Sequence, residues 1–198
     1  MPTTTLQRLA GLAGVIGAAL VVVAAARRAG LVPDDALTEA LAPPASALLL
    51  FTLTALYLVQ REPAGRLGLI GYVLNHLGLA GLFAVEFVTH AVFQFQDEAT
   101  RDAVLDGPGR PYFLVVALTF LVGVVTFGVA SLRTRVLPAG AVGLYMVGLV
   151  PAALRTSVPE PVYLTGLVVG AAGVAWMSAT LLRPAVLDAH LASLRRRG

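Results

Sequence analysis

The sequence has no cysteine, no lysine and few charged residues of any kind. Without cysteine, its 198 residues cannot form disulfides, thiolate metal sites, iron–sulfur clusters or a cysteine nucleophile. All 14 basic residues are arginine, which excludes a lysine Schiff base and the retinal or pyridoxal chemistry that needs one. Only 13% of the residues are charged, about half the fraction typical of a soluble domain. The chain therefore lacks the polar surface that a soluble protein of this length carries.

Apolar residues take the place of the missing charges. They make up 58% of the chain, whose mean hydropathy is +0.84, and a globular core of this size cannot hold them all. A helix that spans a bilayer needs about 20 predominantly apolar residues. Six such stretches occur, at residues 9–26, 42–60, 67–94, 111–132, 136–154 and 161–182. The sequence thus predicts an all-α integral membrane six-helix bundle over residues 1–183, with a tail at 184–198.

Short connections between the stretches favour antiparallel helical hairpins. Arginine opens the first, third and fifth stretches and closes the others, as three hairpins of one orientation would. Placement of positive charge on the cytoplasmic side produces the same pattern without any repeat. Residues 9–26 are also compatible with a signal peptide, because Ala24, Ala25 and Ala26 would suit cleavage, but the long apolar run favours a retained helix.

The distribution of charge predicts the orientation. With both termini in the cytoplasm, nine arginines lie on the cytoplasmic side and five outside, whereas eight acidic residues lie outside. The basic balance therefore indicates membrane orientation and not a nucleic-acid partner. High alanine, glycine, valine and arginine content without lysine suggests a GC-rich bacterial genome, so we expect a multi-pass protein of the bacterial inner membrane.

Segments outside the six stretches have their own predicted structure. Residues 33–41 and 96–105, both in outer loops, have the pattern of short helices, and we favour plain interfacial connections as their role. In the tail, Leu187, Leu191 and Leu194 recur at helical spacing. Three arginines follow them, Arg195, Arg196 and Arg197, and are expected to contact anionic lipid headgroups at the cytoplasmic surface.

The stretch 67–94 contains the polar residues that a bilayer makes costly: Asn75, His76, Glu86 and His90. At about 100° per residue, Glu86 lies close to Asn75 and His90 around the helix, so these three share a stripe. One interpretation is a proton or cation relay that opens to the outer face. The other, which we favour, is a packing role in which Glu86 bonds to His90 or pairs with an arginine, the candidates being Arg27, Arg28 and Arg155.

Most other kinds of catalytic or cofactor site are excluded because the residues that they need are missing, and no metal or cofactor is expected. His76 and His90 have the spacing of two haem ligands, but the only other histidine, His190, lies in the tail. A metal shared by His76 and His90 is excluded because about 21 Å of helix separates them. No serine has a G-x-S-x-G setting, no aspartate lies in a spanning stretch, and H-E-x-x-H is missing.

Small residues form three stripes along which helices could pack closely. They are Ala10, Gly14 and Ala18 in the first stretch, Ala139 and Gly143 in the fifth, and Gly166 and Gly170 in the sixth. We expect them to pack within the chain, although a homo-oligomer or a membrane protein partner would use the same stripes.

The runs LYLVQ at residues 56–60, GRLGLIG at 65–71 and RLAGLAG at 8–14 are similar to small bacterial multi-pass membrane proteins. The resemblance implies a membrane fold and transfers no functional residue. The sequence favours a non-enzymatic membrane component or accessory subunit. The alternatives are a small transporter or channel that uses Glu86 and His90 and, last, an enzyme that acts on a lipid.

Overall fold

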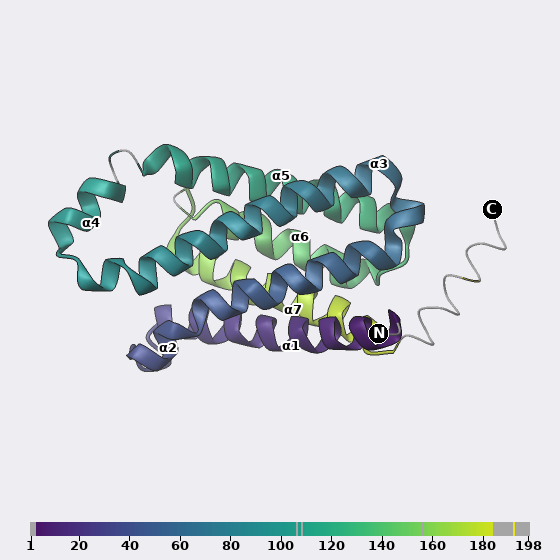
Figure 1. Ribbon diagram of the computed structural model, residues 1–198, viewed down its shortest axis with the longest axis horizontal. Helices are drawn as coiled ribbons and strands as arrows, with labels where there is room; N and C mark the ends of the chain where they lie inside the picture. Colours follow the sequence, from purple (N-terminus) through teal and green to yellow (C-terminus); the bar gives the residue numbers. More distant parts are fainter. Residues whose placement is uncertain (1–2, 106, 108, 156, 184–191, 193–198) are drawn as a thin grey trace.

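The computed structural model describes residues 3–105, 107, 109–155, 157–183 and 192, and all regular elements in this part are helices (Figure 1). No strand occurs in this part, which confirms the predicted all-α class. The elements in order are α1 (Thr3–Arg28), α2 (Ala36–Ala40), α3 (Ala42–Ala91), the 3₁₀ turn η1 (Phe93–Phe95), α4 (Glu98–Leu105), α5 (Arg110–Thr134), α6 (Ala139–Ala153) and α7 (Glu160–Leu181).

Helix α3 is 50 residues long and folds back on itself at Gly65. Gly65 has φ 54° and ψ −147°, a conformation that side chains other than glycine's hydrogen strongly disfavour. The bend divides the helix into a first arm, residues 42–64, and a second arm, residues 66–91. The second arm runs back beside the first (Figure 1). Between the arms, the rings of Tyr57 and Tyr72 stack at 4.4 Å, and Thr54 Oγ1 lies 3.2 Å from Tyr72 Oη. The stretches predicted at 42–60 and 67–94 correspond to these two arms, although the first arm continues to residue 64 and the second ends at Ala91, before η1.

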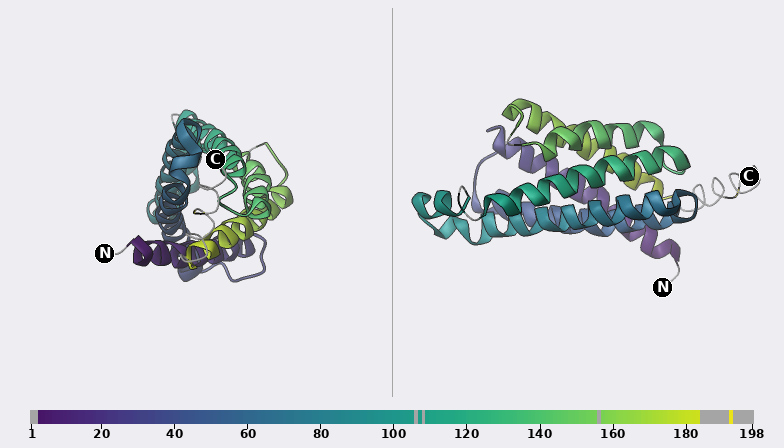
Figure 2. Two further views of the ribbon diagram at one scale, coloured as in Figure 1. Left: turned by 90° about the vertical axis from the view of Figure 1, so that its right-hand side faces the viewer. Right: turned by 90° about the horizontal axis from the view of Figure 1, so that it is seen from above.

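The long segments form a closed ring in chain order. Helix α1 packs on the first arm of α3, where Thr52 Oγ1 donates to the carbonyl of Ala10 at 2.9 Å. The second arm packs on α5, α5 on α6, α6 on α7, and α7 returns to α1. Viewed along its axis, the long helices are arranged in this ring (Figure 2). The start of α1, the bend at Gly65, the α5–α6 loop and the end of α7 lie at one end, called the Gly65 end; α2 and α4 mark the opposite, α4 end (Figure 1).

Glycines allow several of these helices to touch backbone to backbone. A Cβ on Gly148 of α6 would lie 2.6 Å from the carbonyl oxygen of Gly166 and would overlap the backbone nitrogen of Gly170 on α7. Gly14 instead packs against side chains, since a Cβ there would overlap the Oγ of Ser178 on α7 and lie 2.6 Å from Thr52 Cγ2 on α3. The stripes at Gly14 and at Gly166 and Gly170 therefore pack within the chain, as predicted.

The prediction that the stripe at Ala139 and Gly143 packs within the chain is wrong. Ala139 is exposed, and a Cβ on Gly143 would meet nothing within 4 Å among the described residues. The side of α6 that contacts α7 carries Gly148 instead. Spacing along one helix finds a small-residue stripe but cannot tell which side a neighbouring helix covers.

Helix α6 is shorter than the stretch predicted at 136–154. Arg135 ends α5 in the left-handed conformation (φ 55°), and Pro138 precedes α6 with an extended ψ of 123°. Val136 and Leu137 between them are nonetheless buried, at 5% and 2% exposure. They contribute to the core from a connection, which a count of apolar residues cannot distinguish from a helix.

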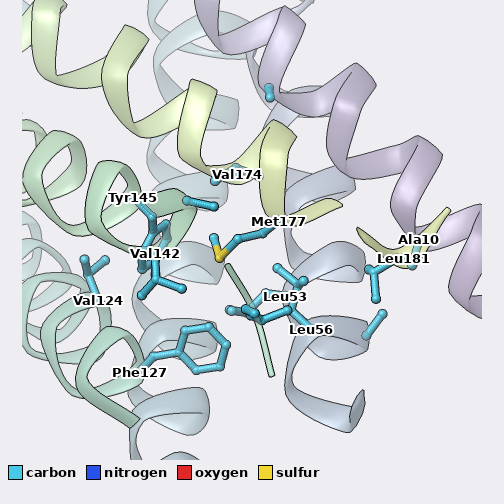
Figure 3. Packing of buried hydrophobic residues seen from close by; sticks show 14 of the residues in the cluster. Ala10, Leu53, Leu56, Val124, Phe127, Val142, Tyr145, Val174, Met177 and Leu181 are labelled. Carbon is cyan, nitrogen blue, oxygen red and sulfur yellow. The ribbon is translucent and has the colours of Figure 1, made fainter. Parts of the chain in front are cut away.

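Apolar side chains cover both the inside and the outside of the ring. The inner cluster includes Leu53, Phe127, Val142, Tyr145, Met177 and Leu181, which converge from α3, α5, α6 and α7 (Figure 3). Large apolar residues are also exposed along the outside, among them Leu12, Ile16, Leu69, Leu118, Val147 and Val168. By length and composition, α1, α3, α5 and α7 are able to cross a membrane, and α6 is a shorter apolar helix.

Two short helices at the α4 end confirm the helices expected at 33–41 and 96–105, although both are shorter. Asp97 precedes α4 and accepts hydrogen bonds from the Thr100 backbone N–H at 2.8 Å and the Thr100 hydroxyl at 2.9 Å. These two bonds hold the pKa of the Asp97 carboxyl below its ordinary value. The tail helix with Arg195, Arg196 and Arg197 falls outside the described residues.

Candidate functional site

A cavity of about 170 Å³ lies inside the ring. Its wall is predominantly apolar and draws on α1, both arms of α3, α5, α6 and α7. Representative lining residues, one from each, are Ala18, Leu53, Leu79, Phe120, Leu149 and Ala171. Its volume is close to that of an engineered cavity of about 150 Å³ that binds benzene, so it has room for one small ring or a length of hydrocarbon chain.

Charged residues line the cavity at its α4 end. Arg28, from the last turn of α1, lies 3.6 Å from Glu86 Oε1 on the second arm of α3. It also donates to Tyr163 Oη on α7 at 3.2 Å, and its guanidinium lies 5.8 Å from the centre of the Tyr163 ring. Arg28 therefore connects three helices. Its neighbour Arg27 donates to Asp34 at 2.7 Å.

Glu86 has two partners. Its Oε2 lies 3.0 Å from His90 Nε2, one turn along the same helix, and its Oε1 faces Arg28. The side chain of Glu86 is 24% exposed, and that of His90 is 7% exposed. Both His90 and Arg28 are among the partners that the packing interpretation predicts for Glu86. Arg155, another candidate, instead places its guanidinium 5.4 Å from the centre of the Tyr163 ring.

Asn75 is on the same cavity wall as Glu86, deeper in the bundle. Its side-chain amide donates to the hydroxyl of Tyr145 on α6, and Asn75 is only 2% exposed. The ring of Tyr145 in turn meets Phe127 edge to face at 6.3 Å. The Asn75–Tyr145 hydrogen bond gives the buried amide a partner inside an apolar core and joins α3 to α6 across the ring.

The four predicted site residues do not form one cluster. His76 packs against Tyr72 with ring centres 5.4 Å apart and is not among the residues that line the cavity. Eleven residues separate Glu86 from Asn75, about 16 Å of helix rise, and the wall between them carries Leu79 and Leu82. Glu86 and His90 thus form a pair at the α4 end, and Asn75 belongs to a separate contact.

Comparison with known proteins adds no relative. No protein-family model, curated protein or solved structure gives a significant match to this chain. Within the described residues, no group of three or more histidine or acidic side chains is placed to hold a metal ion. The cavity and its charged end are therefore the features from which a function can be argued.

Sequence reasoning missed the two tyrosines of the site and a buried polar network at the Gly65 end. Tyr145 and Tyr163 read as ordinary apolar positions, since their partners lie on other helices. In the network, Gln60 Nε2 donates to Ser131 Oγ at 2.9 Å, and Thr134 Oγ1 lies 3.1 Å from Gln60 Oε1. The one available signal was a glutamine at the end of an apolar stretch.

We expect Glu86→Gln to lower the free energy of unfolding by about 1 kcal/mol, because it removes the counter-charge of Arg28 while part of the pair still contacts solvent. Thermal unfolding in detergent measures this loss. Asp102→Asn, an exposed acid of α4, is the matched control and should have no effect. A double variant with Arg28→Gln should lose less than the sum of the single changes; strict additivity would contradict the pairing.

Proposed function

We propose that the chain is an integral membrane protein of the bacterial inner membrane with both termini in the cytoplasm. The apolar exterior of the ring supports a lipid environment, because such a surface is unfavourable in water. The Gly65 end carries arginines with a single acidic residue, Glu62, among the described residues, whereas the α4 end carries most of the acids. That asymmetry is typical of a cytoplasmic Gly65 end.

Reporter fusions test the orientation. A reporter active only in the periplasm should work after Gly109, at the α4 end, and one active only in the cytoplasm should work after Thr134, at the Gly65 end. Activity of either reporter in the opposite compartment would reverse the proposed topology.

Within the membrane, the protein acts as a non-enzymatic component that binds a small apolar molecule or a single hydrocarbon tail in its central cavity. The cavity carries this proposal, since residues from every long segment line it and its wall is predominantly apolar. A volume of about 170 Å³ is too small for both acyl chains of a phospholipid, which favours a single-tailed ligand. Among the described residues that line the wall, no nucleophile lies next to a base, and this supports binding over catalysis.

Photolabelling tests the cavity proposal. The purified protein in phosphatidylcholine nanodiscs is irradiated with a diazirine-bearing fatty alcohol, and the labelled residues are mapped by mass spectrometry. We expect labels on cavity residues such as Leu53 and Leu79. Ala171→Leu should fill the cavity and remove these labels without loss of stability, while Ala172→Leu, which adds the same volume at an exposed neighbour, should not.

Labels confined to outward-facing residues such as Leu69 and Val147, unchanged by Ala171→Leu, would show that the cavity takes no apolar ligand. In that case the ring is a packed structural unit, and an accessory role must depend on its outer surface.

A further inference from the structure

We infer that the ligand of the cavity is a single-tailed amphiphile with an oxyanion head, a carboxylate or a phosphate monoester, which Arg28 and Tyr163 hold at the α4 end. This inference rests on the proposed binding function of the cavity and specifies the chemistry of its ligand. It follows from the donors, the charges and the geometry of the cavity wall.

Arg28 has donors to offer. A guanidinium carries five N–H groups, arranged in a fork that matches a carboxylate or a phosphate. In the structure Arg28 donates to Tyr163 Oη, and its contact with Glu86 at 3.6 Å is longer than a hydrogen bond. The side chain is 19% exposed and lines the cavity, so an oxyanion inside would meet a positioned and largely desolvated guanidinium.

The charges at this end favour an anion. Arg27 and Arg28 line the cavity and Glu86 is the one acid that does so within the described residues. The Glu86 carboxylate contacts both Arg28 and His90. Arg27 pairs with Asp34, which lies outside the cavity. A cationic head would face two guanidiniums in a low-dielectric site, where like charges repel strongly.

The cavity also has the shape that such a ligand needs. On α7, Tyr163, Leu167, Ala171 and Val174 all line it and follow one another at helical spacing, so the wall runs about 16 Å from the charged end into the apolar core. On the second arm of α3, Glu86, Leu82 and Leu79 follow the same order inward. A head at Arg28 therefore places the tail between two apolar helix faces.

The test compares three diazirine probes with the same tail and different heads: a fatty acid, an alkyl phosphate and a fatty alcohol. In phosphatidylcholine nanodiscs, we expect at least one oxyanion probe to label the cavity at about tenfold lower concentration than the alcohol, the effect of one charge-assisted contact. The better of the two identifies the natural head. Excess octanoate or octyl phosphate should compete with the label, and octanol should not.

Three variants locate the recognition at Arg28. Arg28→Gln should abolish the preference for the oxyanion probes while alcohol labelling persists, which also shows that the cavity is intact. Glu86→Gln should increase oxyanion labelling, since it removes the competing carboxylate, and an unfolded protein cannot produce a gain. Arg110→Gln removes an exposed arginine at the same end and should change nothing.

Two outcomes overturn the inference and separate it from the proposal on which it rests. Equal labelling of the cavity by all three probes, unchanged in Arg28→Gln, leaves the cavity as a binding site and eliminates the oxyanion head. Failure of every probe to label the cavity eliminates the binding function and the inference with it.

Discussion

Gly148→Leu is expected to lower the free energy of unfolding by about 3 kcal/mol or more, the largest effect of any single change considered for this protein. At this position α6 and α7 meet with no side chain between them, and a Cβ would lie 2.6 Å from the carbonyl oxygen of Gly166. The obstructing atoms belong to the backbone of α7, so no rotamer change relieves the overlap. The two helices would have to separate, which also disturbs the contact between Gly173 and Tyr145.

Gly143→Leu is the matched control, because it makes the same change on the same helix where a Cβ meets nothing within 4 Å. Its effect should be small or slightly stabilising, since leucine has the higher helix propensity. Thermal unfolding of both variants in the same detergent compares them directly. Equal losses would mean that the cost arises from an effect common to both positions and not from the α6–α7 contact.

The pair Gly143 and Gly148 illustrates what the sequence could and could not predict. Apolar runs and arginine positions are local properties, and they were sufficient for an all-helical chain with long apolar segments and for two arms on either side of Gly65. Which side of α6 faces α7 depends on how six segments close into a ring. No spacing within α6 contains that information, and the small-residue stripe was therefore assigned to the wrong side.

The candidate site, too, could be predicted from the sequence only in part. Helical spacing predicted that Asn75 and Glu86 share a face, and both side chains line the cavity. Their partners come from elsewhere in the chain: Tyr145 is 70 residues from Asn75, and Arg28 approaches Glu86 from α1. A single sequence identifies these polar residues because they interrupt apolar stretches, but the groups that bond to them are set by tertiary packing.

Gln60→Met is expected to lower the free energy of unfolding by about 1 to 3 kcal/mol, because it removes the Gln60 amide from a buried network and keeps the length of the side chain. Gln60 and Ser131 are 1% and 0% exposed, so water cannot replace the lost bonds. The network joins the first arm of α3 to the last turn of α5 next to the bend at Gly65. Its loss should loosen the Gly65 end.

A double-mutant cycle with Ser131→Ala separates this network from simple repacking. Ser131→Ala alone leaves the Gln60 amide without its acceptor, whereas the double variant removes both groups. Thr134 keeps its hydrogen bond to the Ser131 backbone carbonyl at 2.9 Å, which neither substitution touches. The double variant should therefore be less destabilised than the sum of the two single variants. If the losses add without coupling, the Gln60–Ser131 hydrogen bond does not hold the two helices together, and the stability of the Gly65 end comes from its apolar contacts.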